Sequence, residues 1–211
     1  FHAESLENTL QNFPIPDVEI TFTASNVEDR NWNEDWEKAG FDPIIIDNQC
    51  AIVCGNKLED ANHQQDIDSI PTKIVIDAKQ AFGTGTHETT QMIVSLLLNQ
   101  NLTGKRVLDC GCGTGILGIV AAKYGAKEVV AYDIDEWSVN NAQHNAEVNE
   151  VELDVLEGDK RVLSHVSGVF DFVLANINRN IILEDLSAFV SVMTTNSRII
   201  LSGFYEQDAE I

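Results

Sequence analysis

Apolar and polar positions along the second half of the chain follow two periods, one typical of buried strands and one typical of amphipathic helices. From His87 onward the two kinds of segment alternate, which predicts a doubly wound α/β fold with a mostly parallel sheet of five strands. The strands are expected at residues 106–109, 128–132, 153–156, 170–175 and 198–201. The helices are expected at residues 87–99, 115–124, 136–149 and 181–193.

The first eighty or so residues have weaker periodicity and predict a small α/β region. Helices are expected at residues 1–12 and 33–39, and a strand at residues 18–23. Three short β-branched runs, at residues 44–46, 51–53 and 73–77, predict a small antiparallel layer. Residues 57–70 are polar and are expected to form a loop or linker.

The charge of the chain narrows its possible partners. Asp and Glu number 34 against 13 Lys and Arg, which gives a net charge of −21. This charge repels phosphate backbones, so we expect no direct binding of nucleic acid. It favours a basic protein as partner, although acidic surfaces also serve solubility alone. The most apolar run, residues 92–98, is much shorter than the roughly 20 residues of a membrane span, and no secretory leader is visible, so we expect a cytoplasmic protein without a membrane partner.

The four cysteines fall into two close pairs, Cys50 with Cys54 and Cys110 with Cys112. Neither pair has the partner pair or histidines that a zinc site needs, so no metal is expected. Reduced thiols are the expected state in a cytoplasmic protein.

A glycine-rich turn carries the strongest chemical signal. A predicted buried strand leads through Gly111, Gly113 and Gly115 directly into an apolar helix. Glycines let a ligand approach bare backbone, and a helix N-terminus supplies N–H groups and positive potential. The spacing of Gly113, Gly115 and Gly118 also fits the dinucleotide-binding pattern, so the glycines alone leave the ligand open.

Acidic residues at the predicted strand ends favour one ligand. Asp109 would oppose a pyrophosphate but attract an ammonium group, which favours S-adenosylmethionine over a dinucleotide. Asp133 can accept hydrogen bonds from both hydroxyls of a ribose or begin the next helix as its N-cap, a role also open to Asp135. Asp159 is a candidate partner of the adenine amino group.

Residues 81–90, AFGTGTHETT, resemble the signature of the bacterial enzymes that methylate the eleventh protein of the large ribosomal subunit, within the class I S-adenosylmethionine-dependent methyltransferases. The other matching segments are NWNEDWEKAGFDPIII, LDCGCGTGILGI, AYDIDEWSVNNAQHNAEVN, LANINRNIILEDL and IILSGFYEQDAEI. The resemblance implies that Thr90, Gly111, Asp133 and Asn176 contact the cofactor.

The signature segment itself is expected to close over the cofactor, with Phe82, Gly83 and Thr84 as contacts, since glycines permit tight turns. His87 is a candidate base or gate, and equally a structural residue in the first turn of a helix.

Asn176 is the candidate catalytic residue. Methyltransferases of planar amides and bases resemble each other in an Asn-Pro-Pro-Tyr type of motif, whereas this chain has Asn-Ile-Asn-Arg from Asn176 to Arg179. Without the rigid turn and the stacking aromatic, the segment favours a flexible aliphatic amine, such as a lysine or α-amino group of the ribosomal protein. The Asn176 oxygen is then expected to orient that amine.

The resemblance implies three regions: residues 1–56 as the remnant of an N-terminal substrate-recognition domain, residues 57–80 as linker and small β layer, and residues 81–211 as the cofactor domain. The antiparallel strands that end class I sheets are not visible, so a fragment is expected. Three alternatives stay open: a methyltransferase of another protein or small amine, a cofactor-binding module without catalysis, and a nicotinamide dehydrogenase, which Asp109 disfavours.

Overall fold

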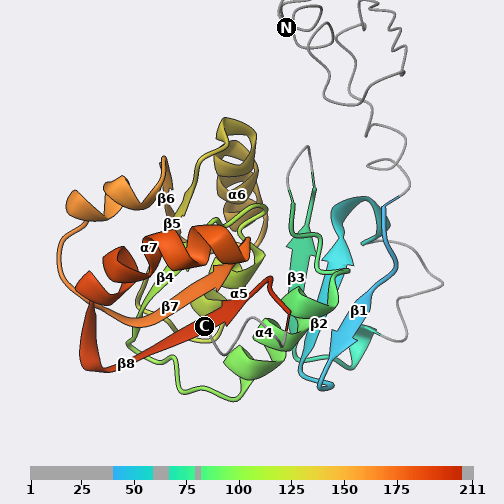
Figure 1. The fold of residues 1–211 in the computed structure, drawn as a ribbon. Helices are drawn as coiled ribbons and strands as arrows, with labels where there is room; N and C mark the ends of the chain where they lie inside the picture. Colours follow the sequence, from blue (N-terminus) through green and yellow to red (C-terminus); the bar gives the residue numbers. More distant parts are fainter. Residues whose placement is uncertain (1–39, 59–66, 79–81, 206–211) are drawn as a thin grey trace, which may run out of the picture. The chain divides into compact units, whose positions relative to one another are not determined.

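The computed structural model describes residues 40–58, 67–78 and 82–205, and two sheets form its framework (Figure 1). The larger sheet contains β4 (Arg106–Cys110), β5 (Glu128–Asp133), β6 (Asp154–Glu157), β7 (Phe170–Asn176) and β8 (Met193–Ser202). The smaller sheet contains β1 (Ile44–Ile46), β2 (Cys50–Cys54) and β3 (Thr72–Ile76). The elements expected at residues 1–12, 18–23 and 33–39 lie outside the described residues.

All neighbouring strands of the larger sheet run parallel, in the order β6-β5-β4-β7-β8. The predicted parallel sheet of five strands is therefore confirmed. The chain moves outward from β4 through β5 to β6 and then crosses to β7 on the other side of β4. At such a switch point the carboxyl ends of adjacent strands leave a crevice in which α/β proteins bind ligands.

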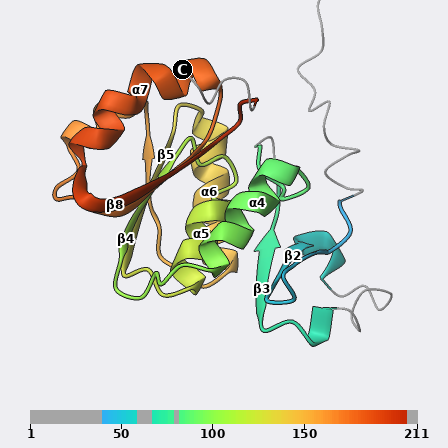
Figure 2. The ribbon, with the colours of Figure 1, turned by 60° about the horizontal axis from the view of Figure 1, so that its bottom comes forward.

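Helices cover both faces of the larger sheet. They are α4 (Glu88–Leu98), α5 (Ile116–Lys123), α6 (Glu136–Val148) and α7 (Arg179–Ser191), with short 3₁₀ helices η1 (Gly55–Lys57) and η2 (Lys160–Ser164). Successive strand residues point to opposite faces, so Val107 packs in the core formed with α4 and α5, whereas Leu108 packs with Phe189 of α7. Figure 2 shows α7 on one side of the sheet and α4, α5 and α6 on the other.

Side-chain caps set the helix ends. Asp135 begins α6 by accepting a hydrogen bond from the Ser138 N–H at 2.9 Å, which confirms its predicted role as an N-cap. Asn178 accepts from the Asn180 N–H at 2.9 Å and begins α7 slightly earlier than expected. The expected extension of this helix to Met193 is wrong, because Met193 pairs with Phe170 at the start of β8.

The smaller sheet is mixed, which corrects the expectation of an antiparallel layer. Strands β1 and β2 are antiparallel, but β2 and β3 are parallel. Residues 55–71 separate β2 from β3, which is enough chain for the crossover that a parallel pair requires. The segment expected as a polar loop at residues 57–70 also contributes to the core, because Ile67 and Ile70 are buried against β2.

The smaller sheet shares one hydrophobic core with the larger one. Ile52 of β2 and Ile74 and Ile76 of β3 are fully buried in the same cluster as residues of α4 and α5. This shared core fixes the chain that precedes the signature segment against the helices of the larger sheet. Among the described residues, no helix is long and apolar enough to cross a membrane.

Candidate cofactor site

The glycine-rich turn links the carboxyl end of β4 to the start of α5, and its three glycines have positive φ angles of +67° at Gly111, +54° at Gly113 and +78° at Gly115. A side chain at Gly113 is excluded twice, by this angle and by space. A Cβ atom there would lie 2.2 Å from the carbonyl oxygen of Phe82. Glycine at this position therefore lets the backbone of the turn approach the backbone of Phe82 closely.

Asp133, the last residue of β5, holds this turn in place. Its Oδ2 atom accepts a hydrogen bond from the Gly113 N–H at 2.9 Å, and its Oδ1 atom accepts from the Asp135 N–H at 3.1 Å. Each carboxylate oxygen has two lone pairs, so both oxygens retain room for a further donor such as a ribose hydroxyl. The next residue, Ile134, presents an exposed apolar side chain beside this carboxylate.

Asp109 lies deeper than its expected role suggested. The residue is only 1% exposed, and its Oδ2 atom accepts a hydrogen bond from the Gly118 N–H of α5 at 2.9 Å. Burial raises the pKa of Asp109 to about 7, the Gly118 hydrogen bond opposes this rise, and the nearby Asp133 charge adds to it. A positive charge bound nearby would lower this pKa again and favour the ionised carboxylate.

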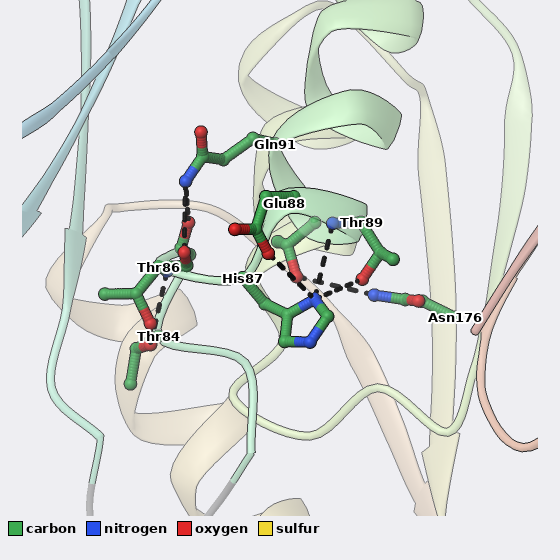
Figure 3. A network of polar contacts seen from close by, with 9 residues as sticks. Thr84, Thr86, His87, Glu88, Thr89, Gln91 and Asn176 are labelled. Carbon is green, nitrogen blue, oxygen red and sulfur yellow. Dashed lines mark hydrogen bonds and ion pairs between the residues drawn. The ribbon is translucent and has the colours of Figure 1, made fainter. Parts of the chain in front are cut away.

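Thr90 and Asn176 lie together although 86 positions separate them in the chain. Thr90 occupies the first turn of α4 and is buried, and Asn176 ends β7. The Asn176 Nδ2 atom donates to the Thr90 hydroxyl at 3.4 Å. Figure 3 shows the Asn176 amide pointing toward the start of α4. The structure thus joins two residues that the family resemblance placed at the cofactor.

The signature segment from Phe82 to His87 runs from the glycine turn, where the Phe82 carbonyl oxygen accepts from the Thr114 N–H, to the start of α4. Phe82 has a fully accessible side chain, 94% exposed, whereas Thr84 is buried and its hydroxyl lies 2.7 Å from that of Thr86 (Figure 3). His87 caps α4, since its Nδ1 atom accepts from the Thr89 N–H at 3.4 Å and lies 2.9 Å from the Thr89 hydroxyl. This geometry gives His87 a structural role in the helix start.

Asp159 follows β6 at the same edge of the sheet. Its Oδ1 atom accepts from both the backbone and the guanidinium group of Arg161, at 2.9 and 2.8 Å, and Arg161 lowers the pKa of Asp159. The preceding Gly158 donates its N–H to the carbonyl oxygen of Asp133 at 2.8 Å. This turn therefore adjoins Asp133, the candidate partner of the ribose hydroxyls. Asp159 therefore stays ionised close to Asp133.

Sequence reasoning missed two buried polar residues at the site, Thr114 and Asn145. Both are 0% exposed, and the Asn145 Nδ2 atom donates to the Thr114 carbonyl oxygen at 2.9 Å. The signal that could have found Asn145 is the spacing of Asn141, Asn145 and Asn149, which places three amides on one face of a helix. No comparable pattern points to Thr114.

The fold and the turn define a class of protein. A parallel sheet in this strand order, with a glycine turn after β4 and an acidic residue at the end of β5, is the architecture of class I methyltransferases. The chain also matches the model of the family described as ribosomal protein L11 methyltransferase (PrmA) over residues 2–211. It belongs to that family, which confirms the resemblance drawn from the sequence.

Individual relatives agree with this assignment. The ribosomal protein L11 methyltransferase of Bacteroides fragilis is 46% identical over 209 residues, which cover 99% of this chain and 72% of the relative. The protein of the same name from Bacteroides thetaiotaomicron is 44% identical over 205 residues, covering 97% and 70%. A crystal structure of ribosomal protein L11 methylase from Lactobacillus delbrueckii subsp. bulgaricus superposes with a TM-score of 0.68 at 31% identity, over 81% of this chain and 84% of that one.

Proposed function

We propose that this chain transfers methyl groups from S-adenosylmethionine to amino groups of ribosomal protein L11. The observation that carries the proposal is the convergence of three features at the carboxyl ends of β4, β5 and β7. These are the bare glycine turn, the Asp133 carboxylate that braces it, and the Thr90–Asn176 pair. Family membership supports the reaction class, and relatives named for ribosomal protein L11 support the substrate.

The residues present fit an amino-acid-bearing nucleoside. The turn from Gly111 to Gly115 leads into the N-terminus of α5, Asp133 offers carboxylate oxygens, and Ile134 offers an apolar surface for a base. We assign the contacts to Phe82, Gly83, Thr84, Thr90, Asp109, Gly111, Gly113, Gly115, Asp133, Asp159 and Asn176. When bound, S-adenosylmethionine supplies a methyl group attached to a positively charged sulfur.

Asn176 is assigned the orientation of the accepting amine. Its Nδ2 atom is directed at the Thr90 hydroxyl, which leaves its Oδ1 atom to accept a hydrogen bond from an amine. An amine of ordinary pKa, about 10.4 for lysine, must lose a proton before its lone pair can react. Holding the neutral amine in line with its target contributes as much as roughly 7–11 kcal/mol through orientation.

The charge of the chain suits a basic substrate. A net charge of −21 attracts a positively charged ribosomal protein and accelerates their encounter, while it disfavours free nucleic acid. We assign residues 1–56 to substrate recognition, residues 57–80 to linker and small β layer, and residues 81–211 to cofactor binding, with β1 and β2 of the first range completing the small sheet. A cytoplasmic location agrees with a ribosomal substrate.

The direct test incubates the chain with unmethylated ribosomal protein L11 and isotope-labelled S-adenosylmethionine, followed by peptide mass spectrometry. We expect labelled methyl groups on lysine or α-amino nitrogens. Calorimetric titration with NAD and with S-adenosylmethionine runs in parallel. Binding of NAD with exclusion of the sulfonium compound would overturn the proposal, and cofactor binding without transfer to any protein would reduce the chain to a binding module.

Two variants separate the roles within the site. Asn176→Ala is expected to lower kcat by at least about tenfold through lost orientation, with a smaller change in cofactor affinity. His87→Asn keeps a helix cap and is expected to leave turnover nearly unchanged. A large loss of kcat in His87→Asn, with unchanged stability, would instead identify His87 as a base or gate.

A further inference from the structure

Thr114 fastens the signature segment to the glycine turn. Its backbone N–H donates to the carbonyl oxygen of Phe82 at 2.8 Å, and its hydroxyl donates to the carbonyl oxygen of Gly83 at 2.5 Å. Thr114 is 0% exposed, so both donor groups belong to a buried residue. Two successive carbonyl groups of the signature segment are therefore held by one residue of the turn.

Asn145 of α6 holds the third polar backbone or side-chain group of Thr114, its carbonyl oxygen. Its Nδ2 atom donates to the Thr114 carbonyl oxygen at 2.9 Å, and its Oδ1 atom accepts from the Asp77 N–H at 3.0 Å. Asp77 lies just after β3, where the chain leaves the smaller sheet, and the chain meets Thr114 again at Phe82. The Asn145 amide thus holds the chain directly at Asp77 and, through Thr114, at Phe82 and Gly83.

We propose that Thr114 and Asn145 are positioning residues that hold Phe82 and Gly83 over the glycine turn, through the chain of hydrogen bonds from Asp77 to Gly83. A buried donor without an acceptor is costly, and undocking would leave both the N–H and the hydroxyl of buried Thr114 without their carbonyl partners, so the docked arrangement of the segment is preferred. The expected effect on cofactor binding rests on the proposed function, in which the docked segment forms one wall of the cofactor site.

The neighbouring Asn149 shows that the link is specific to Asn145. Asn149, the C-cap of α6, is also buried and pairs with both backbone groups of Val75, donating at 2.7 Å and accepting at 2.8 Å. It has the same chemistry and bonds β3 two residues before Asp77, but these hydrogen bonds reach neither the glycine turn nor the signature segment. Asn149→Ala is therefore a matched control for Asn145→Ala.

The test measures amide hydrogen exchange of residue 114 by NMR on the full chain without cofactor, because this N–H is bonded to Phe82 only while the segment is docked. Thr114→Val removes the hydroxyl donor at nearly constant volume, and Thr114→Ser retains it. We expect exchange at residue 114 to be about tenfold faster in Thr114→Val and Asn145→Ala, which corresponds to about 1.4 kcal/mol. Thr114→Ser and Asn149→Ala should remain close to the parent protein.

Calorimetry then links the segment to the cofactor. The two variants with faster exchange should bind S-adenosylmethionine about tenfold more weakly than the two controls. Unchanged exchange in Thr114→Val, or equally fast exchange in Asn149→Ala, would overturn the positioning role. Absence of cofactor binding in the parent protein would refute the proposed function alone, since the exchange measurement does not depend on it.

Discussion

Replacing Asp109 with asparagine tests whether burial keeps this carboxyl group partly protonated near neutral pH. The residue lies beneath the glycine turn, only 1% exposed, and burial raises its pKa from 3.8 to about 7. Asparagine keeps an oxygen that can accept from the Gly118 N–H but cannot ionise. Any pH-dependent difference between the two proteins therefore reports the charge of Asp109 and its interaction with Asp133.

The sign follows from proton binding. Native Asp109 holds its proton more tightly than the unfolded chain does, so its contribution to stability is complete below pH 3.8 and is lost as the pH rises through about 7. With 1.36 kcal/mol for each pKa unit, that contribution falls by about 2.5 kcal/mol between pH 5 and pH 8. The unfolding free energy of Asp109→Asn relative to the parent protein should increase by the same amount over this interval.

Urea unfolding followed by circular dichroism at pH 5, 6, 7 and 8 measures this difference. Lower pH is avoided because the isoelectric point is about 4.3, where the chain loses its net charge. Other carboxyl groups titrate in both proteins and largely cancel in the comparison. A difference that stays constant within about 0.5 kcal/mol would show that Asp109 is ionised throughout, and the burial argument would fail.

Three further outcomes follow from the packing. Gly113→Ala should lower Tm and cofactor affinity far more than Gly104→Ala. A Cβ at position 113 would lie 2.2 Å from the Phe82 carbonyl oxygen, whereas one at position 104 meets nothing within 4 Å. Equal effects of the two substitutions in calorimetry would contradict this prediction. All four cysteines are buried, and burial raises the pKa of Cys50 to about 12 and also raises the pKa of Cys110 and of Cys112. A thiol reagent at pH 8 should therefore label the native chain slowly and the unfolded chain at once. Ile52→Ala should cost about 2–5 kcal/mol in urea unfolding, and a loss below about 1 kcal/mol would deny the shared core.

The larger sheet could be predicted because each of its elements carries its own signal. Strands buried on both faces appear as apolar runs, and helices between them appear at the helical period. Parallel strands joined by helices then bring their carboxyl ends to one edge, which is why the sequence alone is enough to place Asp133 and the glycine turn together.

The smaller sheet could not be predicted to the same extent, since its pairing depends on contacts distant in sequence. β-branched runs predicted the strands, but nothing local distinguishes a parallel neighbour from an antiparallel one. In the segment between β2 and β3, Ile67 and Ile70 are isolated among polar residues in the sequence, and only the structure shows that they are buried against β2. Period-based reasoning is weakest where single residues carry the burial.

The charge of Asp109 illustrates a different limit. The sequence places a carboxylate at the end of β4, and from its sign alone one expects attraction of an ammonium group. Whether the carboxylate is charged depends on its burial and on Asp133, which only the folded structure supplies. An electrostatic argument from sequence is therefore conditional on exposure.

The residues assigned to cofactor contact can be found from the sequence, whereas the residues that hold the signature segment in position can be found only from the folded structure. Glycines and acids at strand ends lie together because the topology requires it, so family motifs and strand patterns both point to them. Thr114 and Asn145 act through hydrogen bonds between segments that meet only in the folded chain. Their polarity is ordinary in the sequence and becomes informative only once both are seen to be 0% exposed, because a buried polar group persists only where a partner satisfies it.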